Sequence, residues 1–332
     1  MSSRVGTTVR TRLWRNGALV QEDFPLAELS DHLDQPGCLV WADICQPDAE
    51  HFATVAEELG LDQHAIEDAI NLHERPKAMR LATHLFLATS ALRRDEESGE
   101  LALSRVSAFT LKGALVTIRL DDHFDMQPVL RRWDDNADLL TWGPRALVHG
   151  LLDEIVDGYF EAIETLDDAV EAAEDMLFDE RPSQAAALQR HTFALRKSLV
   201  TARRVILPMR EVINTVMRRF VSEDGSSELA PYYEDLYDHA LRAADWTESL
   251  RDMISTIFET NMALSDNRMN AVMKKLTSWA AIIAVPTAIT GFYGQNVPYP
   301  GFGEHWGFVF SLAAIVLIAF ALWVSFRKKD WL

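Results

Sequence analysis

Two long runs of apolar residues dominate the last quarter of the chain. Between Lys275 and Glu304 there is no acidic residue, basic residue or histidine, and there is none between Trp306 and Phe326. Each run is long enough to cross a hydrocarbon core about 30 Å thick as a helix. The pattern therefore predicts two transmembrane helices joined by a short loop. The expected segments are a first span (276–294), a loop (295–305) and a second span (306–326).

A helical pattern of unusual length leads into the first span. After Pro231 the chain contains no further proline and no glycine until Pro286. At 1.5 Å per residue such a helix is about 80 Å long, which is too long to be buried within one small domain. We expect a stalk helix over residues 231–275 that continues without a break into the first span.

The segment before the stalk has the pattern of two antiparallel helices separated by the break Arg181-Pro182-Ser183. The first helix carries twelve Asp or Glu residues and no Lys or Arg over Leu151–Glu180, whereas the second, over about Gln184–Phe220, is basic. Apolar residues recur at helical spacing in the first helix. Because opposite charges favour pairing, we expect a helical hairpin over residues 144–230.

The first 143 residues have the mixed pattern of an α/β domain. Asn16-Gly17 lies between two β-forming stretches and predicts a tight hairpin turn. Short runs rich in β-forming residues then alternate with helical patterns. The expected strands cover Cys38–Cys45, Leu85–Leu92, Val106–Leu111 and Leu115–Leu120, and the expected helices cover Ala49–Leu59 and His64–Ile70.

Composition narrows the classes of function. The net charge of −18 disfavours nucleic acid as a partner, since phosphates would be repelled, and favours attraction of cations. The alternative, that acidic residues only keep a large domain soluble, stays open. The two cysteines cannot build a disulfide framework. With no glycine-rich nucleotide loop and no recognisable nucleophile–base set, we expect no organic cofactor and no enzymatic activity.

Basic residues predict the topology. Lys274-Lys275 precedes the first span, and the tail over residues 327–332 begins with three basic residues, whereas the loop carries only Glu304 and His305. Positive residues are retained on the cytoplasmic side of a membrane. We therefore expect a multi-pass protein of the cell membrane, in contact with lipid, with both termini in the cytoplasm and an external loop.

A stripe of small and polar residues follows one side of the stalk end and first span. Its members recur every three or four residues and so share a helix face, while Ile282, Val285 and Ile289 lie largely elsewhere. Such a stripe either lines a pore between several copies or allows close helix packing, and both interpretations stay open on these residues alone. The stripe comprises Asn270, Met273, Thr277, Ala280, Ala284, Thr287 and Gly291.

The segment Tyr293-Gly294-Gln295-Asn296 resembles the Tyr-Gly-Met-Asn signature of the CorA family of divalent-cation channels, which follows the first of two C-terminal spans. The resemblance runs from about residue 63 to the end of the chain. It implies a homopentamer with a cytosolic α/β/α funnel, one stalk helix per subunit lining the pore, and external loops at the mouth. Further matching segments, in family order, are Ile66-Glu67-Asp68-Ala69, His73-Glu74-Arg75-Pro76-Lys77, Glu180-Arg181-Pro182, Pro208-Met209-Arg210-Glu211-Val212, Tyr237-Asp238-His239, Asn270-Ala271-Val272-Met273-Lys274 and the terminal Lys-Lys-Asp-Trp-Leu.

The resemblance assigns Gly294, Gln295 and Asn296 to a selectivity filter. Mg²⁺ gives up its water reluctantly, and a ring of Asn296 amide oxygens would bind those waters without removing them. The sequence departs from the family at Gln295, where the family has methionine, which leaves the choice of ion open. The resemblance also implies a hydrophobic constriction at Met273 and Leu276, with a second departure at Ala284, where a bulkier residue is usual.

Divalent ions in this family also bind between cytosolic domains and hold the channel shut. The resemblance matches Asp235 to one sensing carboxylate and Asp95 to its partner across the subunit boundary. For Asp95 a solvated turn residue is the alternative. Loss of the bound Mg²⁺ would let facing carboxylates repel each other and release the closed state.

We therefore expect a pentameric channel for Mg²⁺ influx, with Co²⁺ and Ni²⁺ as further cargo, gated by cytosolic Mg²⁺. One alternative is a Zn²⁺ transporter of the ZntB type, with or without proton coupling, in which Glu304 or His305 attracts the ion. Another is a membrane-anchored sensor or scaffold that transports nothing.

Overall fold

The computed structural model describes residues 6–33, 35–71, 75–94, 101–177, 182–223, 227–295 and 297–332. The chain divides into two compact units, Met1–Thr256 and Ile257–Leu332. Helix α7 (Ala230–Tyr293) contributes to both, and each unit is described by itself. An α/β unit, a long helix and two apolar C-terminal helices are the elements that the sequence predicts, and this architecture is confirmed.

The first unit is built around a seven-stranded sheet. The strand order is β2-β1-β3-β7-β6-β5-β4, in which β3 and β7 run parallel and every other pair is antiparallel. Asn16 and Gly17, both with positive φ, form the predicted turn between β1 and β2. The strands are β1 (Thr8–Arg15), β2 (Ala18–Glu22), β3 (Cys38–Cys45), β4 (Lys77–Arg80), β5 (Leu85–Arg94), β6 (Leu101–Thr110) and β7 (Ala114–Arg119).

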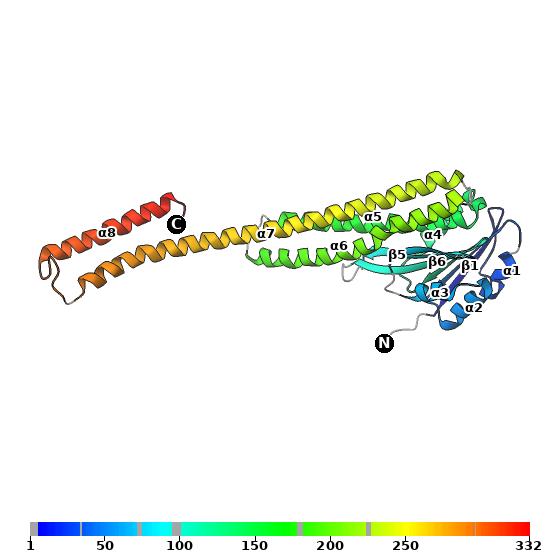
Figure 1. The fold of residues 1–332 in the computed structure, drawn as a ribbon, viewed down its shortest axis with the longest axis horizontal. Coiled ribbons are helices and arrows are strands. Elements are labelled where there is room, and N and C mark those ends of the chain that lie inside the picture. The colour runs from blue at the N-terminus through cyan, green and yellow to red at the C-terminus, as the bar shows by residue number, and fades with distance from the viewer. Residues whose placement is uncertain are drawn as a thin grey trace. The chain divides into compact units, whose positions relative to one another are not determined.

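Three short helices cover one face of the sheet (Figure 1): α1 (Leu29–Leu33), α2 (Ala49–Leu59) and α3 (Gln63–Ile70). The side chain of Asp48 caps α2 and that of Asp62 caps α3, each by accepting two backbone N–H groups. Side chains from these helices and from alternate strand positions form one apolar core, which includes Phe86 and Phe109.

Long helices cover the opposite face (Figure 1), so both faces are buried. Helix α5 (Pro144–Leu177) follows α4 (Gln127–Asp135) and packs against β5, where the Tyr159 hydroxyl donates to the Ser90 carbonyl oxygen at 2.7 Å. Helix α6 (Pro182–Met217) packs beside α5 and continues as a π-helical segment, Arg218–Glu223. The start of α7 joins this layer, and Tyr233 is fully buried there.

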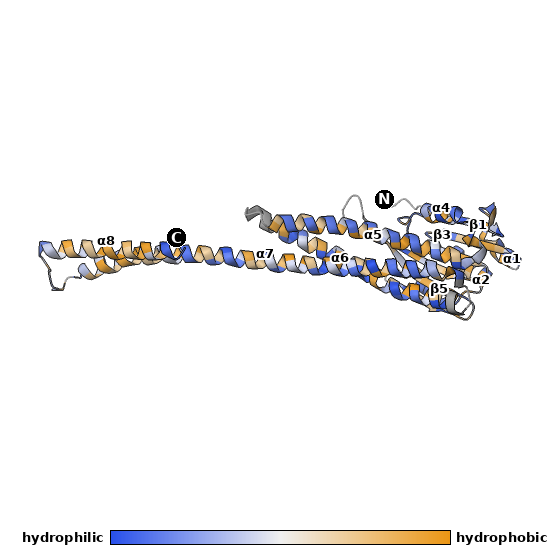
Figure 2. Cartoon of the chain, turned by 90° about the horizontal axis from the view of Figure 1, so that it is seen from above, coloured by the Kyte–Doolittle hydropathy of each residue, from blue (hydrophilic) through white to orange (hydrophobic). Residues whose placement is uncertain are grey.

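The second unit contains the end of α7 and helix α8 (His305–Lys328). Both contain a window long and apolar enough to cross a membrane. Figure 2 shows that hydrophobic residues predominate on α8 and at the end of α7. In Figure 1, α8 runs back in the direction opposite to α7 after the connecting loop.

One buried ion pair ties the centre of the sheet together across its parallel pair. Arg119 on β7 and Asp43 on β3 have side chains that are 7% and 1% exposed, and Arg119 Nη2 lies 2.6 Å from Asp43 Oδ2. Thr117 also donates to Asp43, and Arg119 Nη1 donates to the Phe124 carbonyl oxygen at 2.7 Å. Each guanidinium nitrogen of Arg119 and both carboxylate oxygens of Asp43 thus have a hydrogen-bond partner, as a buried charge requires.

We predict that Asp43→Asn lowers the free energy of unfolding by about 3 kcal/mol, because it leaves the Arg119 charge buried without a counter-charge. Thermal unfolding of the full-length protein in detergent, followed by circular dichroism, should show a midpoint lower by about 6–12 °C. The matched control is Glu22→Gln, which breaks the exposed Arg12–Glu22 pair and should cost under about 1 kcal/mol. Equal shifts in the two variants would contradict the assignment.

Candidate functional site

The small and polar stripe predicted on the first span lies within a single regular helix. All its members fall in α7, and each is exposed in the isolated chain. Since α7 is α-helical throughout, residues three and four apart occupy one face. The face is therefore uncovered and continuous from Asn270 to Gly291. It offers small side chains, two threonine hydroxyls and one amide along its length.

Two threonines near Pro286 satisfy carbonyl groups of the same helix. The Thr287 hydroxyl donates to the Ile283 carbonyl oxygen at 3.0 Å, and the Thr290 hydroxyl donates to that of Pro286 at 2.8 Å. Proline removes one backbone donor from a helix, and hydroxyls of this kind keep the remaining polar groups bonded where no water is present. The helix thus passes Pro286 and ends at Tyr293.

The predicted constriction residues also lie on α7. Met273 and Leu276 are 52% and 62% exposed in the single chain, so both are available to residues of another copy. Ala284, a further two turns along, is exposed as well. Along α7, the bulky apolar residues Met273 and Leu276 therefore precede the small residues at the end of the stripe.

A turn follows α7 directly and contains two of the three predicted filter residues. The Gly294 N–H donates to the Thr290 carbonyl oxygen at 2.8 Å, and the Gln295 N–H donates to that of Phe292 at 3.3 Å. A Cβ atom on Gly294 would lie 3.0 Å from the Thr290 carbonyl oxygen, a tighter contact than side chains usually make. Gln295 is exposed. Asn296 lies outside the described residues.

The two titratable residues of the loop lie at its far end. Glu304 occupies the position before the first residue of α8, its N–H donates to the Gly301 carbonyl oxygen at 3.1 Å, and His305 begins the helix. Both are exposed. A carboxylate at a helix N-terminus is favoured by the helix dipole.

The predicted sensing residue Asp235 lies on the first part of α7, where its side chain is 71% exposed. Its Oδ2 atom lies 3.7 Å from Nε2 of His239, one turn further along the helix. Asp95, the predicted partner, lies outside the described residues.

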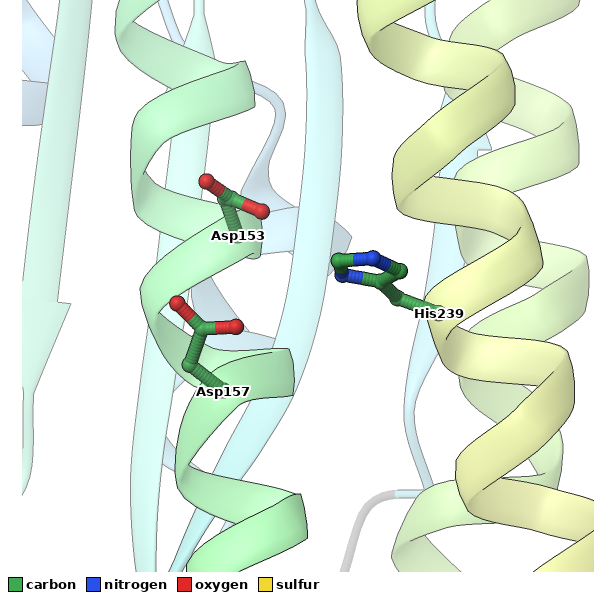
Figure 3. Close-up of side chains that lie close together, drawn as sticks. All are labelled: Asp153, Asp157 and His239. Carbon is green, nitrogen blue, oxygen red and sulfur yellow. The ribbon is translucent and has the colours of Figure 1, made fainter.

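His239 also belongs to a cluster that the sequence did not predict. Asp153 and Asp157, one turn apart on α5, face His239 across the gap between α5 and α7 (Figure 3). Ligand atoms of the three residues all lie within 4.8 Å of one another. Two carboxylates and an imidazole form a donor set that suits Co²⁺ or Zn²⁺ directly and hydrated Mg²⁺ through its waters.

One arginine balances part of the negative charge of this cluster. Arg132 on α4 contacts Asp153, and its Nη2 atom lies 3.0 Å from Glu154 and 2.7 Å from Asp157. Burial would lower the pKa of Arg132, but the neighbouring carboxylates outweigh it and raise the pKa. Three carboxylates thus contact one guanidinium, so the site retains an excess of negative charge that attracts cations.

A cavity of about 400 Å³ opens beside these carboxylates. Arg132, Asp153 and Asp235 line it, together with His149 and Tyr232. Burial lowers the pKa of His149, against the opposing influence of Asp153, so the imidazole is neutral near pH 7 and adds no positive charge. Its Nε2 atom lies 3.1 Å from the Tyr232 carbonyl oxygen. The carboxylates of Asp153 and Asp235 therefore border this cavity.

The sequence contains both halves of this cluster as separate pairs of residues, but it does not show that the two pairs meet. Asp153 and Asp157 are spaced four apart in an acidic helix, and Asp235 and His239 have the same spacing, so each pair shares a helix face. Which two faces meet depends on how α5 and α7 pack, and helix periodicity alone does not decide that.

The chain is similar to known proteins over most of its length. The model of the CorA-like Mg²⁺ transporter protein family matches residues 37–328. The cobalt/magnesium transport protein CorA of Thermotoga maritima is 33% identical over 283 residues, which is 84% of this chain and 79% of that protein. The complete structure of the CorA magnesium transporter of Methanocaldococcus jannaschii superposes with a TM-score of 0.74 at 23% identity, covering 98% of each chain.

The fold is also similar to that of a solved cytoplasmic domain. The cytoplasmic domain of ZntB from Vibrio parahaemolyticus covers 77% of this chain and 98% of its own, with a TM-score of 0.61 at 13% identity; this similarity concerns the fold alone. The family model extends over residues 37–328, which include both apolar helices, and the Thermotoga relative aligns with 84% of the chain. The chain therefore belongs to the CorA family of magnesium and cobalt transporters.

Proposed function

We propose that the protein is a homopentameric channel that admits Mg²⁺, with Co²⁺ and Ni²⁺ as further cargo, into the cytoplasm. The observation that carries the proposal is the uncovered stripe of small and polar residues on α7, which leads to the Gly294-Gln295 turn. One apolar helix cannot conduct ions alone, but copies arranged in a ring bring identical stripes together around an axis. Family membership supports this use of the stripe.

Selection of the ion is assigned to the filter of Gly294, Gln295 and Asn296. Complete dehydration of Mg²⁺ is too costly for rapid passage. A ring of amide oxygens hydrogen-bonds the waters of the ion instead, so binding is selective for charge and size yet weak enough for release. The exposed Gln295 adds a second ring of amide groups where relatives have a thioether.

Closure is assigned to Met273 and Leu276. Rings of apolar side chains at these positions would exclude water from a narrow pore, and a hydrated ion does not cross a dewetted segment. Rotation or tilting of α7 would open the ring by moving these side chains apart.

Control by cytosolic Mg²⁺ is assigned to Asp235, together with the cluster of Asp153, Asp157 and His239. Three carboxylates contact Arg132, so their excess negative charge would be neutralised when a cation binds and would cause repulsion when it leaves. A ligand that binds one state more tightly shifts the population toward that state. Bound Mg²⁺ would thus favour the closed state, with Asp95 of the next subunit as a further proposed ligand.

The proposed orientation places both termini in the cytoplasm. Lys274-Lys275 and the basic tail at residues 327–332 then lie on the cytoplasmic side, and Glu304 and His305 lie outside at the pore mouth. A carboxylate there would raise the local concentration of cations.

A Zn²⁺ transporter is the second candidate, and two observations favour it. Gln295 replaces the methionine of the family signature, and His239 adds an imidazole, a ligand that Zn²⁺ accepts and Mg²⁺ seldom uses. The carboxylates and amides that dominate both sites are oxygen ligands preferred by Mg²⁺, which is why magnesium remains the proposed cargo.

We predict that Asn296→Ala in liposome-reconstituted protein lowers Mg²⁺ influx by at least about tenfold, because the ring of amide oxygens is lost. Influx is followed with an encapsulated Mg²⁺ dye. The control is Val297→Ala, the adjacent loop residue, which should conduct like the parent. Unchanged influx in Asn296→Ala would contradict the proposed filter and favour the alternative of a sensor or scaffold whose helices only anchor it in the membrane.

The ion itself is tested by parallel flux of Mg²⁺, Co²⁺ and Zn²⁺ into the same liposomes, with and without a pH gradient. We expect Mg²⁺ and Co²⁺ to enter and the pH gradient to have little effect on their rates. Zn²⁺ uptake that follows the pH gradient, with no Mg²⁺ flux, would replace the magnesium proposal by the zinc one.

For the sensing site we predict that Asp235→Ala and Asp157→Asn each raise the Mg²⁺ concentration needed for half-maximal protection from proteolysis by about tenfold. Each removes one carboxylate, and about 1.4 kcal/mol of binding free energy corresponds to that factor. Asp245→Ala, an exposed acidic residue further along α7, serves as the control. Protection curves that coincide for all four proteins would remove the cluster from this role.

A further inference from the structure

The loop between α7 and α8 contains an aromatic cluster centred on Tyr299. The Tyr299 ring lies 4.9 Å from that of Tyr293 at 76°, 5.2 Å from that of Phe302 at 87° and 6.1 Å from that of Phe292. The first two contacts have the edge-to-face geometry that aromatic pairs prefer. Tyr299 thus contacts two rings at the end of α7 and one further along the loop.

The hydroxyl of Tyr299 has a specific partner. It donates to the main-chain carbonyl oxygen of Tyr293 at 2.8 Å, and the bond is partly buried. Tyr293 is the last residue of α7, and the carbonyl groups of a final helical turn have no partner within the helix. The bond therefore fixes the end of α7 immediately before the Gly294-Gln295 turn.

The loop that carries Tyr299 is itself anchored to α8. The Phe302 N–H donates to the Tyr299 carbonyl oxygen at 2.9 Å. Gly301 has φ of +86°, and a Cβ atom there would lie 2.9 Å from the Trp306 ring, while one on Gly307 would lie 2.4 Å from the Gly301 carbonyl oxygen. Only glycine allows this close approach of the loop to the start of α8. Tyr299 is thus attached to a supported segment rather than to a free one.

We propose that Tyr299 is a positioning residue for ion selection: its hydroxyl bond to the Tyr293 carbonyl holds the Gly294-Gln295 turn in the geometry that recognises a hydrated divalent ion. The inference rests on the proposed filter function. Tyr299 itself touches no ion. It acts by fixing where the main chain leaves α7, and a ring of side chains selects among ions only if the backbones that carry them are held in place.

The hydroxyl and the aromatic ring of Tyr299 can be tested separately by substitution. Packing alone would require only the aromatic contacts, which Tyr299→Phe retains. Positioning requires the hydrogen bond, which Tyr299→Phe removes. Tyr293→Phe is the matched control, since the acceptor is a main-chain oxygen and the bond survives that substitution. Phe302→Leu removes one ring contact and keeps the hydroxyl.

The experiment measures half-saturating concentrations for Mg²⁺ and Co²⁺ influx in liposomes containing full-length protein. We expect Tyr299→Phe to change the ratio of the two concentrations by about fivefold, the factor that the loss of one hydrogen bond supports. Tyr293→Phe and Phe302→Leu should keep the parental ratio. Thermal midpoint and gel-filtration elution in detergent should be the same for all four proteins.

Three outcomes would overturn the proposal. In the first, the ratio in Tyr299→Phe equals that of the parent. In the second, Phe302→Leu shifts the ratio as much as Tyr299→Phe, which would make packing sufficient. In the third, Tyr299→Phe fails to assemble, which would assign the hydroxyl to folding. Asn296→Ala in the same assay separates these results from failure of the proposed filter. Unchanged influx in Asn296→Ala would mean that the proposed filter does not select the ion, whatever the role of Tyr299.

Discussion

A polypeptide that crosses a hydrocarbon layer must satisfy its backbone hydrogen bonds internally, and helix α7 remains helical through its apolar segment. It runs from Ala230 to Tyr293 without a break, and threonine hydroxyls bond carbonyl groups beside Pro286. Because the helix is regular from Asn270 to Tyr293, each position there has a fixed rotation relative to its neighbours. The small residues of the stripe, the apolar pair at Met273 and Leu276 and the terminal turn therefore keep one order along one face.

The first unit contains two groups of charged side chains that differ in burial and in charge balance. The Asp43–Arg119 pair is buried and saturated with partners, and it stabilises the sheet. The cluster around Arg132 is different, because it is half-buried, borders a cavity and has more carboxylates than guanidinium groups. The first arrangement suits a structural pair, and the second suits a site whose occupancy varies with the ion concentration.

Much of the fold could be predicted from local patterns. Strand β3 and helix α2 have the predicted bounds, since apolar runs and capping residues mark both ends. Strand β6 begins five residues before the predicted start, because Leu101–Arg105 includes polar residues and is held by pairing with β5. The apolar pattern also does not predict strand β4, because Lys77–Arg80 includes charged residues and is held by pairing with β5. The Asp153–Asp157–His239 cluster depends on the packing of α5 against α7, and no single helix encodes that.

The central claim is that the stripe on α7 lines the ion pathway, and cysteine accessibility tests it most directly. Ala284→Cys lies on the stripe, and Ile282→Cys lies about 200° around the same helix. Both are placed in protein whose two cysteines, Cys38 and Cys45, are replaced by alanine. A charged, water-soluble thiol reagent should block Mg²⁺ influx through Ala284→Cys and leave Ile282→Cys conducting. Block of Ile282→Cys alone, or of neither, would contradict the account.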